Sequence, residues 1–211
     1  MKIGIIGAGY IGSTAAKLFA QAGHEVAISN SRGAETLANV AAETGAAAMN
    51  LEDAARFGEV VLVAIPLGKY QTLPAEAFAG KIVVDANNYY PERDGQITEL
   101  DENSMTSSEL VAAHLKGSRI VKAFNTIYYV HLAEQGDTNL PLEDRRAIFV
   151  AGDDAEAKKM VSALIEEIGF APVDTGNLRD GGLTQEPGTA VYNRELTAND
   201  AHALLSGSGG Y

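Results

Sequence analysis

The fold of this chain is decided by a stretch near its start, Gly7-Ala8-Gly9-Tyr10-Ile11-Gly12-Ser13. The stretch follows an apolar run at residues 2–6, which predicts a buried strand, and it opens an amphipathic segment, which predicts a helix that ends at Gly23. In a loop of this kind the first glycine permits a tight turn, the second lets the backbone approach phosphates, and the third lets helix and strand pack closely. We therefore interpret the stretch as a cradle for the pyrophosphate of a nicotinamide dinucleotide at the helix N-terminus, with a plain turn as the alternative.

Short strand-like runs alternate with helical patterns along the rest of the chain. The runs lie at residues 3–6, 26–28, 60–65, 82–84, 120–121, 148–150 and 171–173. This alternation predicts an α/β fold with a doubly wound parallel (Rossmann) sheet. We expect residues 1–175 to form the dinucleotide-binding domain. Residues 176–211 are expected to form a short C-terminal arm or lid that completes an acceptor cleft or contacts a second copy, with a loosely attached tail as the alternative for the last few residues.

The composition of the 211 residues excludes several classes of function. A formal net charge of −12 argues against binding to nucleic acid or to an anionic membrane. The sequence shows neither a signal peptide nor an apolar run long enough to span a bilayer, so we expect a cytoplasmic location without membrane insertion. The absence of cysteine and the scattered positions of the four histidines argue against disulfides, thiolate catalysis and a metal site.

The end of the second predicted strand indicates which dinucleotide is bound. An NAD-binding protein usually carries Asp or Glu there, but this chain reads Ser29-Asn30-Ser31-Arg32-Gly33. A carboxylate would repel a 2′-phosphate, whereas Arg32 can bind it through two parallel hydrogen bonds and Ser31 can donate a hydroxyl hydrogen bond. We therefore predict a preference for NADP(H). The alternatives are a helix-capping role for Ser31 and a solvated surface position for Arg32.

Polar side chains also follow three of the later strands. In a doubly wound sheet ligands bind beyond the carboxyl ends of the strands, so Ile65 and Pro66 should border the nicotinamide half of the cofactor. The strand at 82–84 is followed by Asn87-Asn88-Tyr89-Tyr90-Pro91, whose amides and phenols either hydrogen-bond a carboxamide or an acceptor ring or simply form a turn. Asn125 and Thr126 follow the strand at 120–121, and we expect them to orient the nicotinamide or the acceptor.

Four segments together carry a family resemblance. They are Gly7-Ala8-Gly9-Tyr10-Ile11-Gly12, Ser29-Asn30-Ser31-Arg32, Val121-Lys122-Ala123-Phe124-Asn125-Thr126 and Val150-Ala151-Gly152-Asp153-Asp154. With these segments the chain resembles the NADPH-dependent coenzyme F420 reductases (F420:NADP oxidoreductases) over about residues 1–175, and residues 186–193 look like those of bacterial members. It is also similar to the cytosolic reductase domain of the six-transmembrane metalloreductases, where a sequence like that at 122–126 occurs.

The resemblance implies a hydride transfer between NADPH and a deazaflavin (F420) or flavin-like acceptor, in a cleft closed by the C-terminal segment of a homodimeric protein. It implicates Tyr10, Ile11, Ser31, Arg32, Ile65, Pro66 and Asn125 in binding, together with the glycines of the loop, Gly7, Gly9 and Gly12. We assign no catalytic side chain, because hydride transfer between stacked rings requires proximity and water exclusion more than a proton-moving residue. Three alternatives stay open: an NADP-dependent reductase of a small hydroxyacid or imine, a non-catalytic NADPH-binding redox sensor, and a metalloreductase role through a flavin.

Overall fold

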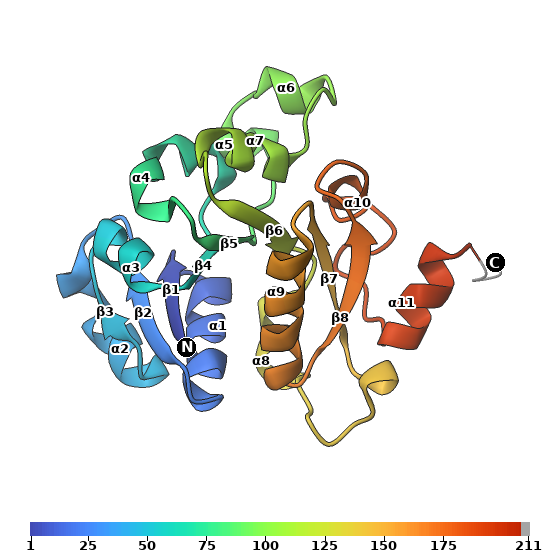
Figure 1. The fold of residues 1–211 in the computed structure, drawn as a ribbon, viewed down its shortest axis with the longest axis horizontal. Coiled ribbons are helices and arrows are strands. Elements are labelled where there is room, and N and C mark those ends of the chain that lie inside the picture. Colours follow the sequence, from blue (N-terminus) through green and yellow to red (C-terminus); the bar gives the residue numbers. More distant parts are fainter. Residues whose placement is uncertain (208–211) are drawn as a thin grey trace.

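One twisted sheet runs through the computed structural model, which describes residues 1–207 (Figure 1). Its strands are β1 (Lys2–Ile6), β2 (Glu25–Ser29), β3 (Ala47–Ala48), β4 (Val60–Val63), β5 (Ile82–Asp85), β6 (Arg119–Ala123), β7 (Ala147–Gly152) and β8 (Ala171–Gly176). They are arranged in the order β3-β2-β1-β4-β5-β6-β7-β8. The order reverses between β1 and β4, which pair in parallel, so a crevice for a ligand is expected at the carboxyl ends of these two strands.

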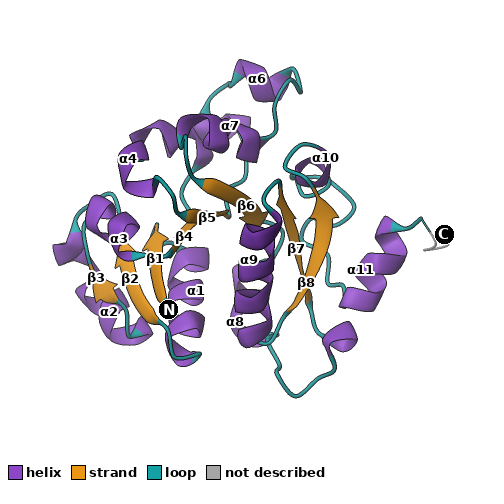
Figure 2. Ribbon diagram, viewed as in Figure 1, coloured by secondary structure: helices purple, strands orange, loops and turns teal. Residues whose placement is uncertain are grey.

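Helices cover both faces of the sheet (Figure 2). The α-helices are α1 (Tyr10–Gln21), α2 (Ala38–Thr44), α3 (Leu51–Phe57), α4 (Ala75–Phe78), α5 (Pro91–Asp94), α6 (Thr98–Asp101), α7 (Ser107–His114), α8 (Tyr129–Glu134), α9 (Ala155–Glu167), α10 (Asp180–Leu183) and α11 (Ala198–Leu205). Three 3-10 helices lie between them, η1 (Ala34–Leu37), η2 (Leu67–Thr72) and η3 (Leu142–Asp144). The apolar sides of α1, α8 and α9 share one core with the sheet, and those of α3, α4 and α7 share another. This layering confirms the predicted doubly wound α/β fold.

One strand pair departs from the predicted parallel arrangement. Strands β1 to β6 pair in parallel, and so do β7 and β8, but β6 and β7 are antiparallel, with Val121 opposite Gly152 and Ala123 opposite Val150. A strand that is buried on both faces is apolar along its whole length, so its residue pattern carries no information about its direction. The predicted doubly wound parallel sheet is thus confirmed, with the β6–β7 pair as an antiparallel exception.

Helix ends follow the sequence signals closely. The side chain of Asn50 accepts a hydrogen bond from the backbone N–H of Asp53 at the start of α3. Asp154 caps α9 in the same way through the backbone N–H of Ala157. In both cases the carboxylate or amide oxygen satisfies a backbone donor that the helix itself leaves unpaired.

The C-terminal segment packs on the far edge of the sheet (Figure 1). In α11, Ala198 and Ala201 are buried against a small apolar core that includes Phe149 of β7 and Val173 of β8. A bridge between Arg146 and Thr197 ties the start of this helix to the start of β7. The segment through residue 207 is thus part of the fold, and the last four residues of the predicted arm, 208–211, lie outside the described residues. No helix among the described residues combines the length and the apolar character that a membrane crossing requires.

A buried polar cluster holds this C-terminal segment to β6. Lys122 is completely buried, and its ammonium nitrogen lies 3.4 Å from a carboxylate oxygen of Glu186. It also donates to the hydroxyl of Ser107 at 2.7 Å, and Ser107 in turn donates to Glu186 at 2.6 Å. Ser108 donates to Asp85 at 2.6 Å, and burial raises the pKa of Asp85 although Lys122 acts in the opposite direction. The cluster therefore joins β5, β6, α7 and the segment after α10.

The glycine loop leaves no room for a side chain at its last glycine. A Cβ atom on Gly12 would overlap the carbonyl oxygen of Gly7, whereas one on Gly9 would meet no atom within 4 Å. We expect Gly12→Ala to lower the free energy of unfolding by about 1 to 3 kcal/mol, because α1 must move away from β1. Gly9→Ala should change it by no more than about 1 kcal/mol, the usual cost of alanine at a helix N-cap. Urea unfolding of the two variants measures both, and equal losses would contradict this account of the loop.

Removal of the Lys122 cation from the buried cluster should destabilise the fold more than removal of a cation from a surface pair does. Lys122→Met leaves Glu186 and Asp85 without their cation, and we expect the free energy of unfolding to fall by about 3 kcal/mol. The matched control is Lys158→Met, because Lys158 pairs with Asp174 at 2.8 Å but the Asp174 side chain is 60% exposed. That change should cost less than about 1 kcal/mol in the same urea titration. A loss as small for Lys122→Met would show that the cluster does not hold the segment.

Candidate functional site

Two hollows lie side by side over the carboxyl ends of β1 and β4. One has a volume of about 830 Å³ and the other about 410 Å³. They share Gly9, Ala64, Ile65 and Pro66, so they form one continuous cleft that passes over the glycine loop. This is the crevice that the reversal of strand order predicts. We call the larger one the Arg32 hollow and the smaller one the tyrosine hollow.

The Arg32 hollow is positively charged although the whole chain is acidic. Of the described residues that line it, Arg32 and Lys69 are charged, and none is Asp or Glu. The loop that carries Arg32 is held by Asn30, whose side-chain oxygen accepts a hydrogen bond from the Arg32 backbone N–H at 2.9 Å. Ser31 also lines this hollow, and η1 begins only after Gly33, so Ser31 is not the N-cap of that helix. The hollow therefore suits a small anionic group such as a phosphate.

The N-terminus of α1 faces the place where the two hollows meet. Gly9 occupies its N-cap position without a side-chain cap, and the first turn carries no acidic residue. The backbone N–H groups of such a turn lack partners within the helix and attract anions. Since the space beside Gly9 is also open, the residues present fit a pyrophosphate lying against the loop.

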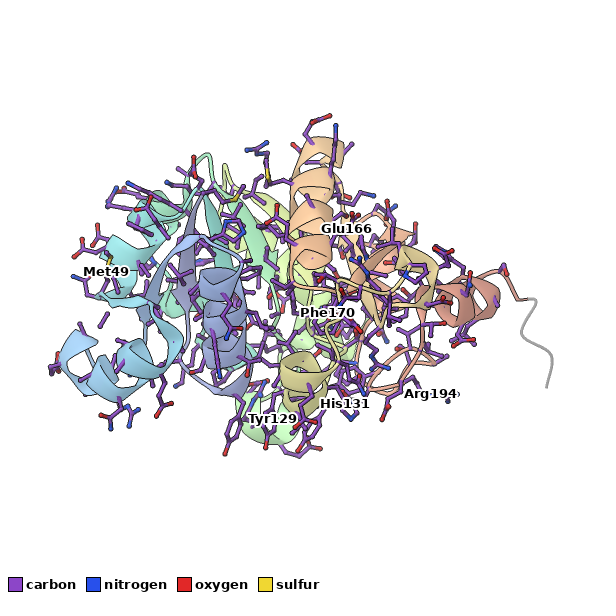
Figure 3. All side chains as sticks on the ribbon, turned by 90° about the horizontal axis from the view of Figure 1, so that it is seen from below. Met49, Tyr129, His131, Glu166, Phe170 and Arg194 are labelled. Atoms are coloured by element: carbon purple, nitrogen blue, oxygen red, sulfur yellow. The ribbon has the colours of Figure 1, made fainter. Side chains whose placement is uncertain are left out.

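The tyrosine hollow is lined by five of the chain's eight tyrosines. They are Tyr10, Tyr90, Tyr128, Tyr129 and Tyr192. The rings of Tyr10 and Tyr129 are stacked, with centroids 4.3 Å apart and planes 14° from parallel. Figure 3 shows Tyr129 at the start of α8, close to the beginning of α1. Flat aromatic surfaces of this kind favour a planar ring as ligand.

Two asparagines in the tyrosine hollow each keep one buried polar atom without a partner among the described residues. The side-chain oxygen of Asn87 accepts a hydrogen bond from the Ile65 backbone N–H at 2.8 Å, which leaves its Nδ2 unpaired. Asn125 uses its Nδ2 to donate to the Gln185 carbonyl oxygen at 2.7 Å and to the Asn88 side-chain oxygen at 3.0 Å, which leaves its Oδ1 unpaired. The backbone partners fix both amide orientations. One buried donor and one buried acceptor thus lack partners, and a ligand that presents an acceptor and a donor would satisfy both.

The structure brings ten of the predicted site residues together in this cleft. They are Gly7, Gly9, Tyr10, Ile11, Ser31, Arg32, Ile65, Pro66, Asn87 and Asn125. Gly12 and Thr126 do not line either hollow: Gly12 is buried against the loop, and the carbonyl oxygen of Thr126 accepts a hydrogen bond from the backbone N–H of Asn193. Their contribution is to hold the walls of the cleft.

Lys69, Arg93 and Tyr192 line the cleft although their sequence context did not predict it, whereas the amides and phenols of residues 87–91 were expected at this edge. Lys69 lies in the Arg32 hollow, and Asn88, Tyr90, Arg93 and Tyr192 lie in the tyrosine hollow. The run Asn87-Asn88-Tyr89-Tyr90-Pro91 carried a signal, because amides and phenols follow a strand end there. Tyr192 had no local signal, since it reaches the hollow from the C-terminal segment. Burial and a hydrogen bond with Tyr90 raise the pKa of Tyr192, so its phenol stays protonated at neutral pH.

Metal ligands do not cluster in the part of the chain that the structure describes: no group of three or more His, Cys, Asp or Glu side chains is placed to hold an ion.

Comparison with known proteins gives three close likenesses. The sequence model of the family described as "NADP oxidoreductase coenzyme F420-dependent" matches residues 2–89. Metalloreductase STEAP3 of Rattus norvegicus is 30% identical over 179 residues, which are 84% of this chain and 34% of that protein, so the chain spans about a third of its curated relative. A hypothetical protein of Sinorhizobium meliloti, SMa0349, is 33% identical with a TM-score of 0.81, and the match covers 93% of this chain and 95% of the other.

A second solved structure agrees with these likenesses. A protein of Arthrobacter sp. FB24 described as an F420-dependent NADP-reductase is 26% identical, with a TM-score of 0.74 and coverage of 93% of this chain and 99% of that one. Because sequence model, relatives and fold agree with the glycine loop and the positively charged hollow, the chain belongs to the coenzyme F420-dependent NADP oxidoreductase family and is an NADP-dependent oxidoreductase.

Proposed function

We propose that this chain transfers a hydride between NADPH and a deazaflavin such as F420, or a flavin-like acceptor, with both reacting rings in the tyrosine hollow. The observation that carries the proposal is the pair of unpartnered amide atoms, Asn87 Nδ2 and Asn125 Oδ1. The carboxamide of nicotinamide presents one carbonyl acceptor and one N–H donor pair, which is the complement of these two atoms. An unmade hydrogen bond at a buried polar atom costs about 1 to 3 kcal/mol, so a ligand that supplies both partners is favoured.

The opposite end of the cleft supports NADPH as the dinucleotide. With the nicotinamide in the tyrosine hollow and the pyrophosphate at Gly9, the adenosine half extends into the Arg32 hollow. Arg32 then binds the 2′-phosphate, and Lys69 provides a second positive charge from the opposite segment. One charge-assisted hydrogen bond contributes about 1.5 to 3 kcal/mol, which corresponds to about a tenfold to hundredfold preference for NADPH over NADH.

The shape and chemistry of the tyrosine hollow support a planar acceptor. Its volume of about 410 Å³ is bordered by the stacked rings of Tyr10 and Tyr129, and Arg93 is the charged residue among those lining it. Aromatic walls next to one cation favour a flat, electron-accepting heterocycle. The description of the Arthrobacter relative as F420-dependent favours a deazaflavin, while the metalloreductase description of the rat relative favours a flavin that passes electrons onward.

The oligomeric state, the cellular location and the role of the C-terminal segment are predictions. We expect a homodimer in the cytoplasm, and we expect the segment from residue 176 to close the acceptor cleft or to contact the second copy. The position of Tyr192 and Asn193 in the tyrosine hollow supports the first role of that segment.

The role of Arg32 can be tested by its effect on the two dinucleotides. We expect Arg32→Ala to raise the Kd for NADPH about tenfold to hundredfold and to change the Kd for NADH less than about twofold, because only NADPH carries the 2′-phosphate. Fluorescence titration of each dinucleotide gives both values. Arg56→Ala is the matched control, since Arg56 pairs with Glu52 on the surface of α3, away from both hollows. Equal loss of NADPH and NADH affinity would mean that the 2′-phosphate lies elsewhere.

The hydride acceptor can be identified in one anaerobic experiment. We expect oxidised F420 to lose its visible absorbance when it is mixed with the protein and NADPH, and to keep it with NADH at the same concentration. FMN replaces F420 in a parallel trace. Bleaching of FMN alone would assign a flavin as acceptor, and turnover of a small imine or hydroxyacid without either ring would assign the reductase alternative. Tight NADPH binding without any turnover would overturn the proposal in favour of a redox sensor.

A further inference from the structure

A chain of hydrogen bonds runs along one wall of the tyrosine hollow. It starts at Asn125 Nδ2, which must be the nitrogen because it faces the Gln185 carbonyl oxygen at 2.7 Å. The same nitrogen donates to the side-chain oxygen of Asn88 at 3.0 Å, which fixes the orientation of that amide. The nitrogen of Asn88 therefore donates to the backbone oxygen of Asn125 at 2.8 Å and to the hydroxyl oxygen of Tyr192 at 3.3 Å. These contacts fix the orientation of both amides.

The chain continues from Tyr192 to Tyr90. Their hydroxyl oxygens are hydrogen-bonded in a short contact. Either oxygen can be the donor in this contact, and the hydrogen bond that Tyr192 accepts from Asn88 favours Tyr192 as the donor to Tyr90. With Tyr192 as the donor, the Tyr90 oxygen accepts, and its own hydrogen is the one left over. Since Tyr90 lines the tyrosine hollow, that hydrogen is available to a ligand there.

A cation lies against the same tyrosine. The guanidinium carbon of Arg93 is 4.9 Å from the centre of the Tyr90 ring. Arg93 is held in place by Asp94, at 2.8 and 2.9 Å, and by the backbone oxygen of Asn88 at 2.7 Å. The guanidinium group therefore covers the Tyr90 ring while it is paired with the Asp94 carboxylate.

Among the described residues that line this hollow, the tyrosines are the candidate acids. Its described lining residues include no Asp, Glu, His or Lys. Tyr10 and Tyr129 present their ring faces to each other at the mouth, where Tyr10 is 72% exposed. Among these tyrosines, Tyr90 is the one whose hydroxyl is hydrogen-bonded to Tyr192, so the C-terminal segment helps to hold it in place.

We propose that the Tyr90 hydroxyl protonates the heteroatom of the acceptor that gains electron density when the hydride arrives. The inference rests on the function proposed above and adds a catalytic acid to it. In the hydride transfer, a C–H bond of NADPH breaks and both of its electrons move with the hydrogen to form a new bond to hydrogen on the acceptor. The O–H bond of Tyr90 breaks as a new N–H or O–H bond forms on the acceptor, and water then returns the proton to Tyr90. Tyr192 is a positioning residue, because it acts through Tyr90.

The test compares Tyr90→Phe, Tyr192→Phe and the double variant in single-turnover reduction of F420 by NADPH. We expect Tyr90→Phe to slow the reduction about 100-fold, the usual effect of losing a general acid, with the Kd for NADPH changed less than about twofold. Tyr192→Phe should slow it about tenfold, and the double variant should be no slower than Tyr90→Phe alone, because both changes act through one hydroxyl. Tyr70→Phe is the control, since Tyr70 of η2 packs against His114 of α7 and does not line the tyrosine hollow.

A spectroscopic measurement separates acid catalysis from mere packing. With NADP⁺ bound, no hydride is available, so the spectrum of oxidised F420 can be recorded without reaction. A hydrogen bond from Tyr90 should shift the absorption band of F420, and Tyr90→Phe should abolish that shift. The melting temperature of this variant should stay within about 2 °C of that of the parent chain. A Tyr90→Phe rate within about twofold of the parent chain would overturn the proposal, as would losses that multiply in the double variant. If the parent chain reduces F420 or FMN, the proposed function stands whatever Tyr90→Phe does. A parent chain that reduces neither overturns both.

Discussion

The architecture depends on two places where backbone lies directly on backbone. A Cβ atom at Gly7 would overlap the carbonyl oxygen of Ala64, and one at Gly12 would overlap the carbonyl oxygen of Gly7. The first contact brings the end of β4 against the glycine loop, and the second seats α1 behind β1. Together they put the N-terminus of α1 and the end of β4 on one cleft. At Gly9 the missing side chain serves the opposite purpose, because it leaves space open for a ligand.

A second constraint is electrostatic and acts at a distance from the cleft. A lysine as deeply buried as Lys122 requires a carboxylate partner, and Glu186 comes from the C-terminal segment. This ion pair holds the neighbouring Gln185, whose carbonyl oxygen accepts a hydrogen bond from Asn125 and so orients it. The chain then continues from Glu186 to Tyr192, which lines the tyrosine hollow. The segment therefore contributes a wall of the site because an ion pair in the core holds it there.

Most of the fold was predictable because its signals are local. The glycine loop and the cap of Asn50 each depend on a few neighbouring residues, and a run such as 60–65 depends only on its own composition. The direction of β7 was not predictable from composition, and β3, with two residues, is too short to show any pattern. Helices of four residues, such as α5 and α6, likewise fall below the length at which a helical period can be recognised.

The candidate site likewise contains residues that local sequence signals predict and residues that only the folded chain brings in. Arg32 follows β2 directly, so its position at the strand end could be deduced from sequence, whereas Lys69 reaches the same hollow only because η2 folds back over the end of β4. The charge of the cleft depends on residues of both kinds. The net charge of −12 is spread over the surface and is screened beyond about 8 Å at physiological salt, so the nearby cations decide what binds. Of the described residues that line the cleft, Arg32 and Lys69 lie at one end and Arg93, which is paired with Asp94, lies at the other, so the Arg32 end carries the greater positive charge.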